Sequence, residues 1–110
     1  MIYLCGKISG DPNYKEKFAA YERYYSRIGR VFNPCTLDSS LPYDVLMGVC
    51  LAIVRSADLV VEMPDYPNSP GARAEVARCI SDDIHHIMIS VDTDRRILNS
   101  NSGSSETVDL

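Results

Sequence analysis

A short glycine-containing loop near the N-terminus, Cys5-Gly-Lys-Ile-Ser-Gly10, has the composition of an anion-binding segment. Its two glycines allow backbone N–H groups to approach an anion, while Lys7 offers a positive charge and Ser9 a hydroxyl group. The same G-x-x-x-G spacing is common in simple tight turns, so the loop alone does not identify a ligand. The candidate binding residues here are Gly6, Lys7, Ile8, Ser9 and Gly10.

A second segment, Asn68-Ser-Pro-Gly-Ala-Arg-Ala-Glu75, places polar residues at the expected start of a helix. Ser69 and Gly71 stand where unpaired backbone N–H groups favour a phosphate or a carboxylate, and Glu75 lies one turn further, within reach of such a ligand. Each residue also has a plain structural interpretation. Ser69 is then an N-cap, Gly71 a turn residue, and Glu75 an exposed acid stabilised by the helix dipole.

Four short apolar or β-branched runs predict the strands that would position these segments. They are Ile2–Cys5, Val31–Phe32, Asp58–Met63 and His86–Val91.

Each segment between these strands has helical periodicity. Residues 14–28 repeat aromatic and apolar side chains at steps of four and three, up to Ile28, and Gly29 ends the helix. The other two predicted helices are residues 43–56, with Leu46, Val49, Cys50 and Ile53 facing inward, and residues 72–82, which bury Val76, Cys79 and Ile80.

The βαβαβαβ alternation predicts an α/β protein with a small parallel sheet covered on both faces. We expect a flavodoxin- or Rossmann-like three-layer fold with strand order 2-1-3-4. In such sheets, ligands bind outside the carboxyl ends of the strands where the strand order reverses, which is where the two polar segments would meet.

The 110 residues allow one domain, which we assign to residues 1–91. Residues 92–110 include an Asn-, Ser- and Gly-rich stretch without apolar periodicity, and we expect them to form a flexible polar tail. A domain this small leaves sheet edges and helix faces incompletely covered, which favours a homodimer or a larger homo-oligomer.

Fifteen acidic against eleven basic residues give a net charge of −4, which disfavours binding to polymeric nucleic acid or to an anionic membrane. No apolar run is long enough to span a bilayer, and the start of the chain lacks the pattern of a signal peptide, so we expect a cytoplasmic protein.

The four cysteines are far apart in the sequence, which predicts free thiols and no disulfide bonds. Together with His85 and His86 they lack the spacing of metal ligands, so no metal site is predicted.

Taken together, the start Ile2–Gly10, the strand Ala57–Val61 and the pattern Ser69-x-Gly71-x-x-x-Glu75 resemble the nucleoside 2-deoxyribosyltransferase superfamily. Within it, the sequence is most similar to 2′-deoxynucleoside 5′-phosphate N-hydrolases and to small phage and bacterial proteins related to them. The resemblance extends in order and spacing over residues 1–91.

This resemblance implies cleavage or transfer at the N-glycosidic bond of a 2′-deoxynucleoside or its 5′-monophosphate, without a cofactor. Glu75 matches the nucleophile that attacks C1′, and Tyr3 matches a tyrosine near the deoxyribose. Ser69 and Gly71 match phosphate-binding positions, and the Gly6–Gly10 loop matches the segment around sugar and phosphate.

One position departs from the family pattern. The hydrolase branch has an aspartate that orients the sugar or protonates the leaving base, and this chain has Cys50 there. A thiol is a poor replacement for a carboxylic acid as proton donor, so either another group protonates the base or catalysis is weak or absent; Asp65 and Glu62 are the local candidates for that group. Tyr66 is either an ordinary surface aromatic or a residue that stacks on the base.

Three functions therefore remain open. The first is the glycosidase or transferase reaction through Glu75. The second is a nucleotide-binding module that keeps the pocket but lacks catalysis because of Cys50. The third is a flavodoxin-like interaction domain that binds no nucleotide. In the first two, the partner is a small nucleoside or nucleotide, and a neighbouring subunit could complete the pocket.

Overall fold

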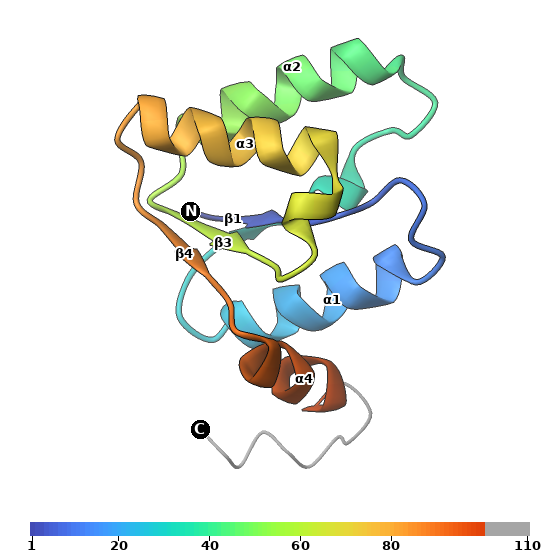
Figure 1. The fold of residues 1–110 in the computed structure, drawn as a ribbon, viewed down its shortest axis with the longest axis vertical. Helices are drawn as coiled ribbons and strands as arrows, with labels where there is room; N and C mark the ends of the chain where they lie inside the picture. The colour runs from blue at the N-terminus through green and yellow to red at the C-terminus, as the bar shows by residue number, and fades with distance from the viewer. Residues whose placement is uncertain (101–110) are drawn as a thin grey trace.

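The computed structural model describes residues 1–100, which fold into a parallel sheet between two layers of helices (Figure 1). The strand order β2-β1-β3-β4 confirms the predicted α/β architecture. None of the helices within these residues is long and apolar enough to cross a membrane. The elements are β1 (Ile2–Cys5), α1 (Tyr14–Tyr25), β2 (Val31–Phe32), η1 (Pro34–Thr36), α2 (Tyr43–Val54), β3 (Leu59–Glu62), η2 (Tyr66–Asn68), α3 (Pro70–Ser81), β4 (His86–Met88) and α4 (Val91–Ser100).

The central strands β1 and β3 end at the same level of the sheet. Their register pairs Ile2 with Leu59 at one end and Cys5 with Glu62 at the other. From β1 the chain crosses to β2 on one side, and from β3 it crosses to β4 on the other side. The strand order therefore reverses between β1 and β3, and a crevice is expected outside their carboxyl ends.

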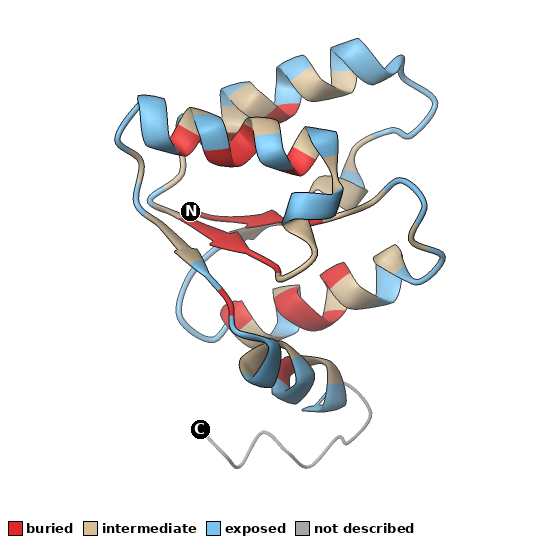
Figure 2. Cartoon of the chain, in the orientation of Figure 1, coloured by how far each residue is buried: buried red, intermediate tan, exposed pale blue. Residues whose placement is uncertain are grey.

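Side chains of β1 alternate between the two faces of the sheet, as the two-residue period of a strand requires. Ile2 and Leu4 pack into a core with α1 and α4, while Tyr3 and Cys5 pack into a second core with α2 and α3. Figure 2 shows the buried residues on the sides of the helices that face the sheet. The two layers of helices thus enclose a central strand that is buried on both faces.

Three predicted helix positions are wrong in detail. Helix α1 ends at Tyr25, so Ile28 lies beyond it and is exposed. Ile80 is 68% exposed on α3, and Val49 is exposed on α2. Each helix buries only the side that faces the narrow sheet. Apolar residues at the margins of the predicted helix face therefore remain in contact with solvent.

Residues 92–100 do not form the flexible tail that the sequence predicted. They belong to α4, which packs against α1 and buries Ile97 completely. The Ser90 hydroxyl accepts a hydrogen bond from the backbone N–H of Thr93, and the Tyr21 hydroxyl donates one to Asp94. The overlooked signal was a serine N-cap followed by acidic residues in the first turn. The rest of the predicted tail, 101–110, lies outside the described residues.

The same cap shortens the last strand. We predicted β4 to run to Val91, but it ends at Met88 because Ser90 begins the turn into α4. The domain boundary expected at residue 91 therefore falls inside a packed element, and α4 belongs to the fold.

Truncating the buried side chain of α4 tests this correction. Ile97→Ala should lower the free energy of unfolding by about 2–5 kcal/mol, because it removes packing around a fully buried residue. Urea denaturation followed by circular dichroism measures the change. The matched control is Ile80→Ala on the exposed side of α3, which should change stability by less than about 0.5 kcal/mol. Equal effects of the two substitutions would contradict a packed α4.

Candidate functional site

A cavity of about 170 Å³ opens at the carboxyl edge of the sheet, where the reversal of strand order predicts one. Its walls come from the end of β1 and the loop after it, from η1, from α2 between Tyr43 and Cys50, and from the beginning of α3. The structure brings seven sequence-predicted residues together in this lining: Gly6, Ile8, Ser9, Cys50, Ser69, Gly71 and Glu75.

Glu75 is the only residue with a formal charge among the described residues that line the cavity. Only 7% of its surface is exposed, which excludes the interpretation as a solvent-facing acid of the first helical turn. The Tyr3 hydroxyl donates a hydrogen bond to Glu75 Oε2 over 2.7 Å. Burial raises the pKa of Glu75 to about 7, although the hydrogen bonds from Tyr3 and Cys5 oppose that rise. The group therefore changes its charge near neutral pH.

The position of Glu75 follows from how α3 begins. The Ser69 hydroxyl accepts a hydrogen bond from the backbone N–H of Ala72 over 3.2 Å, and Pro70 occupies the first helical turn. With the start fixed, the helical period turns Ala72, Glu75 and Val76 toward the sheet, where all three are buried. The predicted role of Ser69 as an N-cap is confirmed.

Neutral groups surround Glu75. Tyr3 is fully buried beneath the cavity and stacks on Phe32 with ring centroids 5.8 Å apart. Burial raises the pKa values of Tyr3 and Cys5 above their usual ranges, so both keep their protons. The Cys5 thiol also donates to the Ala72 carbonyl over 3.5 Å. The carboxyl group thus has hydrogen-bond donors but no positive charge within the lining.

Cys50 of α2 also lines the cavity. Its thiol interacts with the Tyr3 hydroxyl, and burial raises its pKa above the usual value. The thiol therefore holds its proton more firmly than a free cysteine does. A group of this kind is a weak proton donor to a leaving group.

Tyr43 and Met47 of α2 close around Gly71, and the sequence did not predict either residue. A methyl group added to Gly71 would lie 3.0 Å from Met47 Sδ and 3.1 Å from the Tyr43 hydroxyl oxygen. A side chain at this position would therefore fit only if Met47 and Tyr43 moved by a few tenths of an ångström. Both residues could have been found, because the first turns of helices that follow parallel strands lie at the same edge as the strand ends. Pro34, Leu37 and Leu46 complete the apolar wall on this side.

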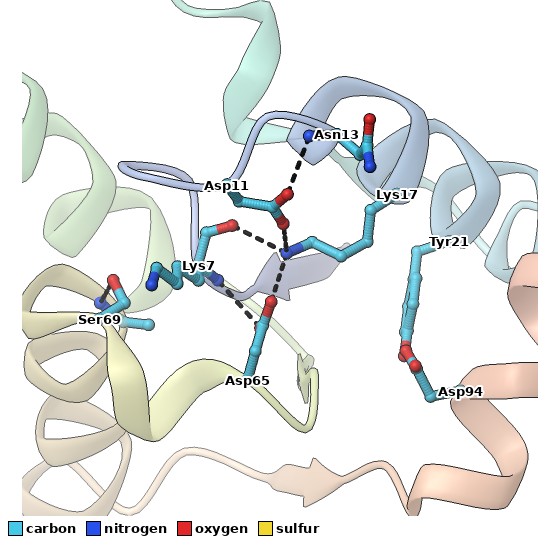
Figure 3. Close-up of polar contacts among 9 residues, drawn as sticks. Lys7, Asp11, Asn13, Lys17, Tyr21, Asp65, Ser69 and Asp94 are labelled. Carbon is cyan, nitrogen blue, oxygen red and sulfur yellow. Dashed lines mark hydrogen bonds and ion pairs between the residues drawn. The ribbon is translucent and has the colours of Figure 1, made fainter.

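Lys7 and Gly10 lie beside the cavity and do not line it. Gly10 has a φ of +83°, a conformation that side-chain-bearing residues rarely adopt, and a methyl group there would lie 3.9 Å from Lys7 Nζ. The Lys7 ammonium has no ion-pair partner among residues 1–100. In Figure 3 its side chain extends in the direction of Ser69 at the start of α3. Lys7 is thus a positive charge without an ion-pair partner within residues 1–100, in the loop after β1.

Asp65 is held by a partly buried lysine outside the cavity (Figure 3). Lys17 Nζ forms an ion pair with Asp65, a second one with Asp11 at 2.7 Å, and a hydrogen bond to the Lys7 carbonyl at 2.9 Å. The other oxygen of Asp65 accepts the backbone N–H of Lys7. Asp65 therefore fastens the loop after β1 to the loop after β3, and the structure does not bring it to Glu75.

Tyr66 and Glu62 also lie outside the lining. Tyr66 is half-buried against the core under α2 and α3. Glu62 is buried and paired with His86, whose side chain is partly exposed, and His85 is exposed. Neither Glu62 nor Asp65 is placed to replace the acid that the resemblance implies at Cys50.

The opposite edge of the sheet carries Asp58, which pairs with the amino group of Met1. The contact joins the amino terminus of the chain to the residue that directly precedes β3. Within residues 1–100 there is no cluster of three or more His, Cys, Asp or Glu side chains that could hold a metal ion.

Comparison with known proteins gives one match. The protein-family model described as "Domain of unknown function (DUF4406)" matches residues 1–87, a span that contains every residue of the cavity lining. No curated protein and no solved structure matches the chain.

The raised pKa of Glu75 predicts a specific dependence of stability on pH. Between pH 4.5, its ordinary pKa, and about 7, the folded protein keeps a proton that the unfolded chain loses, so stability falls as the pH rises. Glu75→Gln keeps an acceptor for Tyr3 and removes the titration. At pH 8 this variant should be more stable than the wild type by up to about 3 kcal/mol, with little difference at pH 4.5.

Urea denaturation at the two pH values measures this difference. Glu16→Gln, the same change on the exposed side of α1, should behave like the wild type at both. A Glu75→Gln variant whose stability runs parallel to that of the wild type across this pH range would contradict the raised pKa.

Proposed function

The chain belongs to the family "Domain of unknown function (DUF4406)", and we propose that it cleaves or transfers at the N-glycosidic bond of a 2′-deoxynucleoside or its 5′-monophosphate, with Glu75 as nucleophile. The observation that supports this proposal is the buried Glu75 carboxyl group, held by Tyr3 at the wall of a largely apolar cavity. Its pKa of about 7 leaves a substantial carboxylate fraction at neutral pH. The resemblance to deoxyribosyltransferases assigns the same residue.

In the proposed reaction a Glu75 carboxylate oxygen attacks C1′ of the sugar. The bond between C1′ and the base nitrogen breaks, and the base leaves with the electron pair and takes up a proton. The resulting glycosyl ester is then attacked at C1′ by water or by the nitrogen of a second base, which restores the carboxylate and releases one proton. This route follows the logic of retaining glycoside hydrolysis.

The size of the cavity fits a single ring. An apolar cavity of about 150 Å³ holds one benzene molecule, and the cavity beside Glu75 encloses about 170 Å³. We therefore place the deoxyribose ring inside and the base and phosphate toward the openings. Apolar walls around the sugar exclude water and strengthen the interaction between the carboxylate and positive charge that develops at C1′.

The N-terminus of α3 suits a 5′-phosphate. Ser69 and Gly71 at this N-terminus line the cavity, and in Figure 3 the Lys7 side chain extends in the direction of Ser69. A few such groups bind one phosphate locally even though the chain carries a net charge of −4.

A nucleotide-binding module without turnover is the second candidate, and Cys50 favours it. The described lining of the cavity contains no carboxyl group besides Glu75, and the pKa of the Cys50 thiol is raised. Protonation of the leaving base then depends on a weak donor or on solvent. Binding would remain while the rate of base release falls.

Release of free base tests the leading proposal. The wild type is incubated with each 2′-deoxynucleoside and each 5′-monophosphate, and the base is measured by chromatography. Glu75→Gln should lower the rate at least about 10³-fold, since it removes the nucleophile, whereas Glu16→Gln should leave it unchanged. The wild-type kcat/KM should rise with pH and level off above about 7, where Glu75 is ionised.

The outcomes separate the candidates. Absence of base release from every substrate, together with thermal stabilisation by one of the nucleotides, would support the binding module instead. Absence of both release and stabilisation would overturn both functions.

Restoring a carboxyl group at position 50 tests the reason for any slow turnover. Cys50→Asp should raise the rate of base release at least about tenfold, because a positioned general acid contributes a factor of about 10²–10⁴. Cys50→Ser provides the control, since it keeps the size of the side chain without supplying an acid. Equal rates for Cys50→Asp and Cys50→Ser would contradict the assignment of this position to the leaving base.

A further inference from the structure

Helix α2 is far more apolar than its burial explains. Of its twelve residues, Asp44 is the only one with a charge. A helix that is apolar all round is normally buried all round. On the side facing the sheet, Cys50 and Val54 are buried, yet on the outer side Val45 is 43% exposed and Val49 is 36% exposed.

The exposed apolar residues form one continuous line, which we call the α2 outer stripe: Val45, Gly48, Val49 and Ala52. Their spacing of three and four places them on one side of the helix, opposite Val54. A methyl group added to Gly48 would meet nothing within 4 Å, so the centre of the stripe is open to solvent and no side chain projects from it at this position. Figure 2 shows this exposed side of α2 facing away from the sheet.

We propose that the α2 outer stripe is the contact between two copies of this chain, related by a two-fold axis that passes near Gly48 and Val49 with the two helices antiparallel. The stripe contains no charged residue, whereas each copy carries a net charge of −4. Two copies therefore approach with least repulsion at this face. The small residues at its centre let the two helix backbones come close.

Charges at the two ends of the helix complement each other under this symmetry. Asp44 in the first turn and Arg55 at the C-cap are separated by three turns and lie on the same flank of the stripe. A two-fold axis between them brings Asp44 of each copy beside Arg55 of the other.

Both side chains are available for this pairing. Asp44 has no ion-pair partner among residues 1–100, and Arg55 has an exposed ion pair with Asp82 at 3.4 Å, of a kind that contributes little. A charged ligand or an acidic partner protein would meet only an uncharged surface along the stripe itself. A second copy matches both the apolar centre and the charged ends.

Light scattering after size-exclusion chromatography tests the proposal on the full chain. The wild type should have twice the mass of one chain. Val49→Glu should raise the dissociation constant at least about 100-fold, since two carboxylates would be buried at the axis. Val91→Glu, the same change at an exposed valine of α4, should leave the dimer intact.

The end charges provide a second and independent measurement. Asp44→Arg should weaken the dimer by placing like charges together, and the double variant Asp44→Arg with Arg55→Asp should restore it. Circular dichroism confirms that each variant is folded. A monomeric wild type, a dimer that persists in Val49→Glu or dissociates in Val91→Glu, or a double variant no better than Asp44→Arg would each overturn the proposal.

Discussion

The hydrogen bond between Tyr3 and Glu75 is the interaction on which the functional account depends. It joins the central strand to the helix that begins at the cavity, across 72 positions of sequence. A carboxyl group buried among neutral donors has no opposite charge to hold its proton off, so burial sets its pKa near neutrality. The same burial that costs stability at high pH would, in the proposed reaction, give a nucleophile with little surrounding water.

Acidic side chains of the loops after β1 and β3 form ion pairs outside this cavity. Lys17 gathers Asp11 and Asp65 with the Lys7 carbonyl, and so fixes the loop after β1 against the loop after β3. The single positive charge of Lys17 offsets one of the two negative charges of these aspartates. Glu75 is consequently the one formal charge within the described lining, which is a suitable condition for reaction with an electron-poor carbon.

The sequence predicted the sheet and its order because strand and helix periods are local properties. It also placed Ser69, Gly71 and Glu75 at the correct edge, since that follows from the topology. It could not predict that Lys17 binds Asp65, a contact between residues 48 positions apart that depends on the assembled loops. Tyr43 and Met47 were missed because periodicity defines a helix face without naming the neighbour that the face meets.

The most direct test of the central claim is to locate the covalent intermediate. The protein is mixed with the 2′-deoxynucleoside 5′-monophosphate from which base release is fastest, quenched in acid, digested and analysed by peptide mass spectrometry. The account predicts a deoxyribose 5-phosphate adduct on the peptide that contains Glu75, at that residue and absent from Glu75→Gln. Turnover without any adduct, or an adduct on another side chain, would contradict the role of Glu75 as nucleophile.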